Sequence, residues 1–263
     1  MIPRAVVAAL FAFLLASPAM VVYTSFQPSL ALGTPQAATL RWYARALAEP
    51  RFVMALETST IVALAATVTA LLVGVPASVG LVRGRVPAAR LVLALLLSPL
   101  TLPGLVLAMG LLMFLVAVVQ PLTGASWVGT TMALVVAHVA VTVPWVVRTV
   151  VASLSSLDPT LEDAARGLGA TPVAAFFLVT LPAIRSGIVA AAIFAFVVSF
   201  GNFALSLFFT GGRVVTLPIA IFEYVDRFQD PTIAALSTIM ILLTTGLVAL
   251  AGWLTRGGGA GAW

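Results

Sequence analysis

The chain has 263 residues, of which 62% are hydrophobic and only 8% are charged, and its mean hydropathy is +1.19. A soluble globular domain usually carries about 25% charged residues, so this composition excludes an ordinary soluble domain and indicates a single membrane domain. The 13 basic residues are all arginines scattered along the chain, and they form no basic stripe of the kind that binds nucleic acid.

The sequence contains neither cysteine nor lysine. Without cysteine there is no disulfide, thiolate metal site or cysteine nucleophile. Without lysine there is no P-loop, whose lysine contacts nucleotide phosphates. We therefore expect this chain to hydrolyse no ATP by that route. The sequence also shows no Ser-His-Asp, paired-carboxylate or metal-ligand constellation, so we expect it to bind no cofactor or metal and to hold no catalytic residue.

Intervals free of charge predict six membrane-spanning helices, because a helix of about 20 residues rises about 30 Å and crosses the hydrocarbon core. The long interval between Arg90 and Arg148 is divided by a polar turn at residues 120–126. The predicted fold is an all-α integral membrane domain over residues 1–263, with spans at about 5–26, 58–82, 91–118, 128–150, 184–209 and 232–254.

The first span also has features of a cleavable signal peptide, since Arg4 and an apolar run are followed by small residues at 16–19. The apolar run continues to Phe26, which is long for a signal. We therefore expect an uncleaved helix.

Arginines that flank the spans predict the orientation, because cytoplasmic loops carry an excess of basic residues. The more basic set of loops, which we place in the cytoplasm together with both termini, holds Arg4, Arg83, Arg85, Arg90, Arg148, Arg166, Arg185 and Arg256. The opposite loops mix both signs of charge and hold Arg41, Arg45, Arg51, Arg213 and Arg227 among five acids.

A polar segment at 155–182, between the fourth and fifth spans, predicts two short helices. Asp158 with Pro159, and Thr171 with Pro172, are cap-and-proline starts, and Gly169 suits a left-handed helix end. The first helix has an apolar face of Leu161, Ala164, Ala165 and Leu168. Such a helix could lie on lipid or be bound by another protein.

The segment resembles the signature loop of permease subunits in binding-protein-dependent ABC importers. That signature is Glu-Ala-Ala, three residues, Gly, nine residues, Ile, one residue and Leu-Pro. Its spacing is kept throughout, with Asp and Val replacing Glu and Ile, by Asp163, Ala164, Ala165, Gly169, Val179, Leu181 and Pro182. The resemblance covers roughly residues 55–255 and implies that the first helix couples the chain to an ATPase, with Glu162 and Asp163 as polar contacts, Ala164 and Ala165 as the close-packing surface and Gly169 as the bend.

The resemblance also implies the partners: two ATPase subunits that bind ATP and magnesium, a second and non-identical permease, and a periplasmic or lipoprotein substrate-binding protein. The location would be a bacterial inner membrane. Residues 216–219 and 230–237 resemble the spermidine/putrescine branch, which implies a polyamine-like substrate, with ferric iron, phosphonate, thiamine and opine as alternatives.

Two further groups of polar residues are candidate sites. His138, Ser199 and Asn202 fall within spans and could line the pathway or simply bond neighbouring helices. Glu223, Asp226 and Asp230, which stand among aromatic residues in an outward loop, could dock the binding protein or attract an organic cation.

Two rival classes of protein are open from composition alone. An intramembrane enzyme should show clustered catalytic polar residues at one membrane face, and a secondary transporter should carry a carboxylate within a span. The charge-free intervals contain no carboxylate, which favours the importer permease.

Overall fold

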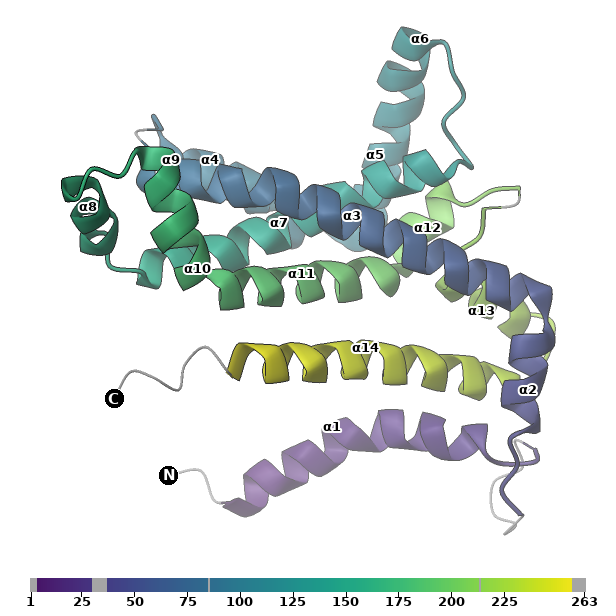
Figure 1. The fold of residues 1–263 in the computed structure, drawn as a ribbon. Helices are drawn as coiled ribbons and strands as arrows, with labels where there is room; N and C mark the ends of the chain where they lie inside the picture. Colours follow the sequence, from purple (N-terminus) through teal and green to yellow (C-terminus); the bar gives the residue numbers. More distant parts are fainter. Residues whose placement is uncertain (1–3, 30–36, 85, 213, 257–263) are drawn as a thin grey trace. The chain divides into compact units, whose positions relative to one another are not determined.

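The structure, a computed structural model, describes residues 4–29, 37–84, 86–212 and 214–256 (Figure 1). Arg85 and Arg213 of the orientation argument lie outside these residues. The described part folds into helices, with one isolated β-bridge between Gly211 and Val214. The predicted all-α class is therefore confirmed.

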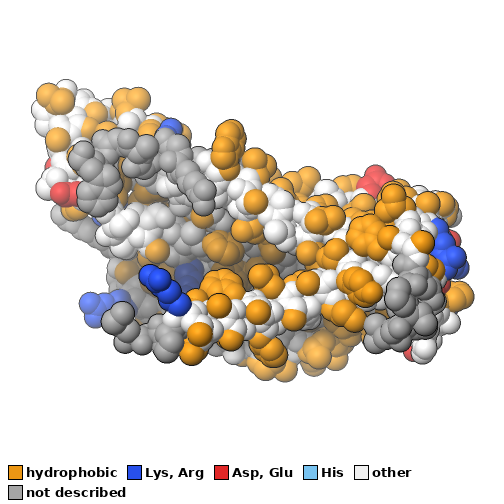
Figure 2. All heavy atoms as spheres, turned by 90° about the horizontal axis from the view of Figure 1, so that it is seen from below, with side chains coloured by type: hydrophobic (Ala, Val, Ile, Leu, Met, Phe, Trp, Pro, Cys, Tyr) orange, Lys and Arg blue, Asp and Glu red, His pale blue; other side chains and the backbone are white. Residues whose placement is uncertain are grey.

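Five of the described helical stretches are long and apolar enough to cross a membrane: α1 (Arg4–Ser25), α3 (Pro50–Arg83), the run from α5 to α6 (Gly104–Thr123), α7 (Thr131–Ser156) and most of α14 (Thr232–Arg256). A sixth arises if the stretches Pro172–Ala183 and Arg185–Phe200, which meet at a 70° bend, make one span. Hydrophobic side chains are far more numerous than charged ones on the face drawn in Figure 2, as lipid contact requires.

The shorter elements connect these stretches. They are α2 (Arg41–Ala48), α4 (Ala89–Leu97), the 3₁₀ turn η1 (Ser98–Thr101), α5 (Gly104–Phe114), the π turn η2 (Leu115–Val119), α6 (Gln120–Thr123), α8 (Thr160–Gly167), α9 (Pro172–Ala175), the π turn η3 (Phe176–Thr180), α10 (Leu181–Ala183), α11 (Arg185–Phe200), α12 (Phe203–Phe209) and α13 (Leu217–Val225).

The predicted third span, 91–118, is broken in two. Helix α4 passes into η1 and ends, Leu102 is extended with φ −85° and ψ 142°, and α5 begins after Pro103. Proline has no N–H to donate and disfavours a helical conformation in the residue before it. The second piece consequently starts at Gly104 and continues to Thr123, beyond the predicted end of the span.

A proline follows closely after each of the two π turns. Turn η2 ends two residues before Pro121, and turn η3 ends two residues before Pro182. A proline inside a helix clashes with the carbonyl group four residues earlier and removes one hydrogen bond. A locally widened turn just before the proline is one way for the helix to avoid this clash.

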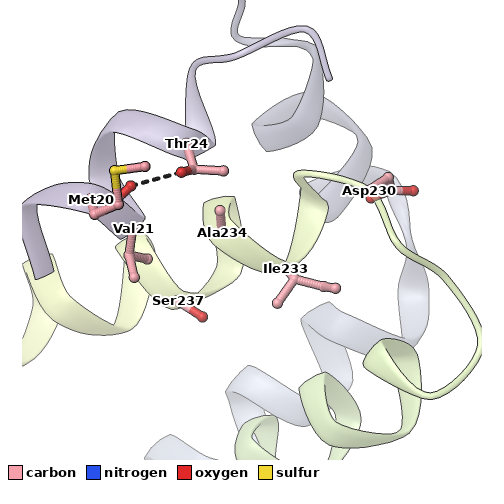
Figure 3. A pocket seen from close by; sticks show the side chains of 7 residues that line it. All are labelled: Met20, Val21, Thr24, Asp230, Ile233, Ala234 and Ser237. Atoms are coloured by element: carbon pink, nitrogen blue, oxygen red, sulfur yellow. Dashed lines mark hydrogen bonds between the residues drawn. The ribbon is translucent and has the colours of Figure 1, made fainter. Parts of the chain in front are cut away.

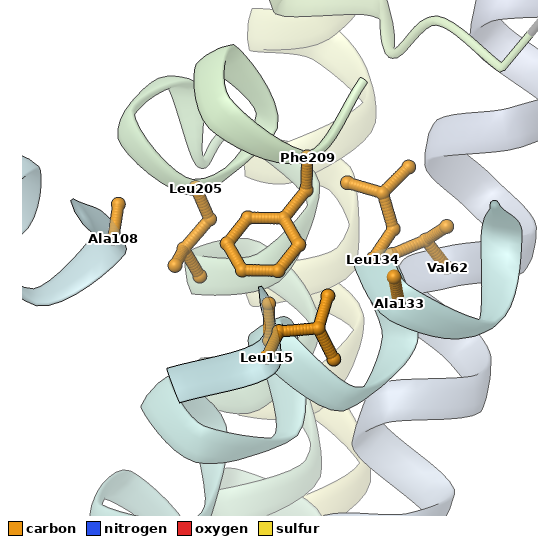
Figure 4. Close-up of a cluster of buried hydrophobic side chains, with 8 residues drawn as sticks. Val62, Ala108, Leu115, Ala133, Leu134, Leu205 and Phe209 are labelled. Carbon is orange, nitrogen blue, oxygen red and sulfur yellow. The ribbon is translucent and has the colours of Figure 1, made fainter. Parts of the chain in front are cut away.

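The described chain divides into two compact units, residues 1–58 with 215–247 and residues 59–214 with 248–263. In the second unit, one buried cluster joins side chains of α3, α5, η2, α7 and α12, among them Val62, Leu115, Leu134 and Phe209 (Figure 4). A further cluster joins α3, α7 and α11 through Ala70, Val146, Val150, Leu154, Ile184, Ala191 and Ala195.

Small residues allow close packing around α7. A Cβ atom on Gly74 of α3 would lie 2.7 Å from Cγ1 of Val146, and one on Gly187 of α11 would overlap Oγ of Ser153. Glycine is therefore required at both positions. Helix α7 forms the centre of this unit because α3 and α11 both approach it without intervening side chains.

Candidate functional site

Helix α8 is built by the local signals that the sequence predicts. Oδ1 of Asp158 accepts a hydrogen bond from the backbone N–H of Thr160 (2.9 Å), and this bond lowers the pKa of the Asp158 carboxyl below its ordinary value. At the other end Gly169 has φ +94°. The N–H groups of Gly169 and Ala170 donate to the carbonyl groups of Arg166 and Ala165, which is the Schellman pattern of a helix end.

The second helix of the segment begins as predicted. Oγ1 of Thr171 accepts from the N–H of Ala174 at 3.2 Å, and Pro172 occupies the first turn. The helix passes through η3 into the Leu181-Pro182 pair and ends at Ile184, where α11 starts. The Leu-Pro pair therefore stands at the 70° bend that leads into the membrane helix.

The predicted apolar face of α8 is open among the described residues. The exposed fraction is 50% for Leu161 and 92% for Leu168. Asp163 and Ala164 are also exposed, and Ala165 is half-buried. A face of this kind, with an acidic residue beside it, suits contact with another protein.

Glu162 points the other way. It is buried, and its Oε1 atom accepts hydrogen bonds from Nε of Arg83 (3.0 Å) and from Oγ1 of Thr180 (3.0 Å). Sequence reasoning grouped Glu162 with Asp163 as a contact for the ATPase. The structure instead places its carboxylate inside the chain, while Asp163 remains on the outer side.

Arg83 extends this cluster to the end of α7. Its Nη2 atom donates to the carbonyl oxygen atoms of Leu154 (3.2 Å) and Leu157 (2.9 Å). In the sequence, Arg83 indicates only the orientation of the chain, and nothing singles out Thr180. Arg83 is 79 positions from Glu162 along the chain, and Thr180 is 18 positions from it in another helical turn. No local spacing pattern therefore indicates either residue.

The candidates within the spans do not form one group. Nδ1 of His138 and Oγ of Ser199 are 2.7 Å apart and both side chains are buried, so these two residues link α7 to α11. Asn202 instead lies at the break between α11 and α12, where its Oδ1 accepts from the N–H of Leu205 at 2.9 Å. It caps α12, a role that the preceding Gly201 could have indicated.

Two of the three outward acids are engaged within the chain. Glu223 pairs with Arg51, and Oδ2 of Asp230 contacts Arg45 (3.2 Å) and the hydroxyl of Tyr224 (2.8 Å). Oδ1 of Asp230 also accepts from the N–H of Thr232 (2.9 Å) at the start of α14. Partial burial by itself raises the pKa of Asp230, but the hydrogen bonds from Thr232 and Tyr224 and the charge of Arg45 lower it overall.

Asp226 differs from its two neighbours. It is exposed and forms no ion pair with any described residue. Asp226 is therefore the acid of this loop that is most available to a partner.

A cavity of about 240 Å³ lies beside Asp230, between α1 and α14 (Figure 3). Its lining is mostly apolar, and the hydroxyl of Thr24 on its wall already donates to the carbonyl oxygen of Met20. This cavity shows no cluster of reactive groups. The polar clusters around α8 and α13 are thus the features that a function has to explain.

Helical spans, a capped polar helix between the fourth and fifth of the predicted spans, and a Leu-Pro bend describe a polytopic membrane protein with one structured polar segment. The chain belongs to the family of binding-protein-dependent transport system inner membrane components, whose model matches residues 70–257. It is the permease subunit of an ABC importer and a multi-pass inner-membrane protein, and its family consists of transport components, not enzymes.

Similar proteins support this membership. The putrescine transport system permease protein PotI of Escherichia coli (strain K12) is 31% identical over 244 residues, which cover 92% of this chain and 86% of that protein. The molybdenum transport system permease protein ModB of Mycobacterium tuberculosis is 33% identical over 204 residues, 74% of this chain and 76% of that protein. A bacterial ABC transporter that imports alginate shares the fold, with a TM-score of 0.72 at 14% identity over 95% of this chain and 92% of that chain.

Proposed function

We propose that α8 is the coupling helix of this permease and that its open apolar face binds a groove of a cytoplasmic ATPase. The observation that carries this proposal is the two-sidedness of α8: its face with Leu161 and Leu168 is exposed, while Glu162 is bonded to the membrane helices. Asp163, Ala164 and Ala165 would contact the ATPase. Gly169 and the Leu181-Pro182 pair would set the direction of the chain.

The complete importer, in this proposal, has two ATPase subunits that bind ATP and magnesium, a second and non-identical permease, and a substrate-binding protein on the outer side. The chain has no lysine and hence no P-loop, which supports a separate ATPase. We expect the purified chain alone to hydrolyse no ATP and to show ATPase activity only in complex with such a subunit. Hydrolysis by the isolated chain would contradict the proposal.

The orientation proposed from the arginines places α8 and both termini in the cytoplasm. Because the chain has no cysteine, single cysteines can be labelled cleanly in membrane vesicles. We expect an impermeant thiol reagent to label Ser155→Cys only from the cytoplasmic side and Gln229→Cys only from the outer side. The reverse pattern would overturn the orientation.

The substrate class proposed is a polyamine-like organic cation. The resemblance to PotI over 92% of this chain supports it, while ModB is a relative of similar identity that is named for molybdenum transport. Uptake by the assembled importer in proteoliposomes, measured with labelled putrescine and labelled molybdate side by side, distinguishes the two. Uptake of molybdate alone would refute the cationic substrate and leave the permease assignment in place.

A further inference from the structure

Glu162 is the single buried residue of α8. The other residues of the helix are exposed, apart from the half-buried Ala165. An eight-residue helix is marginal by itself and depends on its packing for stability. The position of α8 on the membrane helices therefore depends largely on the contacts of one carboxylate.

Three elements meet at that carboxylate, and Arg83 connects a fourth. Arg83 is the last residue of α3, Glu162 belongs to α8, Thr180 ends η3, and the carbonyl groups that Arg83 also contacts lie at the end of α7. Figure 1 shows α8 beside α9 at the end of α3 and α7. One ion pair thus connects the proposed coupling helix to two membrane helices and to the segment that leads into α11.

The chemistry of this junction explains why arginine is suited to it. A guanidinium group presents several N–H donors in a fixed planar arrangement. Here Nε contacts the carboxylate while Nη2 contacts two carbonyl groups at a helix end, where the helix dipole favours positive charge. A lysine side chain has a single nitrogen atom, so it cannot reproduce this planar arrangement of donors.

We infer that Arg83, Glu162 and Thr180 are positioning residues that fasten α8 to the ends of α3 and α7, so that movement of α8 displaces these membrane helices. The part of this inference that concerns transmitted movement rests on the proposed coupling function of α8. The attachment itself can be tested without any ATPase.

The first experiment measures the mobility of α8 in the full-length chain in lipid nanodiscs. A spin label is attached to Ala164→Cys, an exposed position on α8. Glu162→Gln and Arg83→Gln should each increase the mobile fraction of the spectrum at least about threefold, because a buried charge that loses its partner is strongly destabilised. The control Arg90→Gln removes an exposed arginine and should leave the spectrum unchanged. Unchanged spectra for both test variants would overturn the inference.

The second experiment measures the amount of substrate taken up per ATP hydrolysed by the assembled importer. Thr180→Val removes the hydroxyl that contacts Glu162, and Thr180→Ser keeps it. We expect Glu162→Gln to lower the ratio about tenfold, because it breaks the buried pair that attaches α8, Thr180→Val to lower it less, and Thr180→Ser to preserve it. Assembly, measured by copurification of the ATPase, normalises each value.

The outcomes separate the two ideas. If the unaltered chain neither assembles with an ATPase nor responds to a binding protein, the proposed function fails while the mobility result stands. If the unaltered importer works and all variants keep its ratio of uptake to hydrolysis, the inference fails. A double variant that carries both Arg83→Gln and Glu162→Gln distinguishes loss of the pair from general misfolding. If the two residues act as a pair, the double variant should show no larger change in mobility or in the uptake ratio than the single variants.

Discussion

The acidic residues around α8 and those around α13 form ion pairs of different kinds. Near α8, the side chains of Arg83 and Glu162 are 19% and 9% exposed, and both make further hydrogen bonds. Near α13, Asp230 is also partly buried, with a side chain 20% exposed, but its partner Arg45 is 55% exposed, and the side chains of Arg51 and Glu223 are 42% and 39% exposed.

This difference in burial determines what each pair can contribute. Exposed pairs are worth at most about 1 kcal/mol and weaken as salt is added. A buried pair costs roughly 3–5 kcal/mol when one partner is removed, because the other charge is left without compensation. The cluster near α8 therefore suits a fixed attachment between helices. The cluster near α13 suits a docking surface, because its exposed charged groups can form ion pairs with a partner protein instead of with each other.

The largest effect we predict tests this contrast directly. Arg83→Ala should destabilise the purified chain by roughly 3–5 kcal/mol, since it leaves Glu162 buried and unpaired. Arg45→Ala should cost less than about 1 kcal/mol. Thermal unfolding in nanodiscs, followed by circular dichroism, measures both. Equal shifts in melting temperature would remove the distinction between the two clusters.

The features that the sequence predicted correctly are local ones. The left-handed conformation of Gly169 and the cap formed by Thr171 depend on residues within one turn of the chain. The apolar spans follow from composition in the same way. Such features can be predicted because their physical causes lie next to each other in the sequence.

The features that were missed depend on distant residues. Arg83 and Glu162 are 79 positions apart, and Arg45 and Asp230 are 185 apart. Without the fold, Glu162 and Asp163 are two similar neighbouring acids, and only packing shows that they face opposite ways. The prediction of Asn202 as a pathway residue stays untested, and the sequence did not show that its side chain caps α12 at a helix break.

The next prediction concerns the bend after α8, where the effect arises from the backbone. Gly169 has φ +94°, and no atom lies within 4 Å of the place its Cβ would take. Gly169→Val should cost about 1–3 kcal/mol of local strain and reduce uptake and ATPase assembly at least about fivefold. Gly167→Val is the matched control, because Gly167 lies within the helix and also has open space around its Cβ position. Similar losses of uptake in both variants would show that the added side chain obstructs contact with the ATPase, and that backbone strain at Gly169 is not the cause.

A smaller effect should appear on acidification. Asp230 has a lowered pKa in the folded chain, so its stabilising contribution is present above the unfolded value of about 3.9 and is lost as the pH falls through the folded value. Asp230→Asn keeps an acceptor for the N–H of Thr232 but removes the ion pair with Arg45. Melting temperatures between pH 7 and pH 3 should decline less steeply for Asp230→Asn than for the unaltered chain. Parallel declines would show that the pair of Asp230 with Arg45 contributes nothing measurable to stability.

The smallest effect concerns Asp226, which we propose as part of the docking surface for the binding protein. This acid is exposed and forms no ion pair with the described residues, so a partner with a basic rim could contact it. Asp226→Arg should weaken the ATPase activity stimulated by the binding protein about two- to fivefold at low salt, as expected for an exposed pair worth at most about 1 kcal/mol. The basal ATPase activity should not change.

Raised salt distinguishes docking from a structural defect at this position. Exposed charges are screened over about 10 Å at 0.1 M ionic strength, so the difference between Asp226→Arg and the unaltered importer should shrink as salt increases. Glu49→Arg makes the same change of charge at an exposed acid outside the α13 loop and should have a weaker effect. Full stimulation of the Asp226→Arg importer at low salt would exclude this acid from the docking surface.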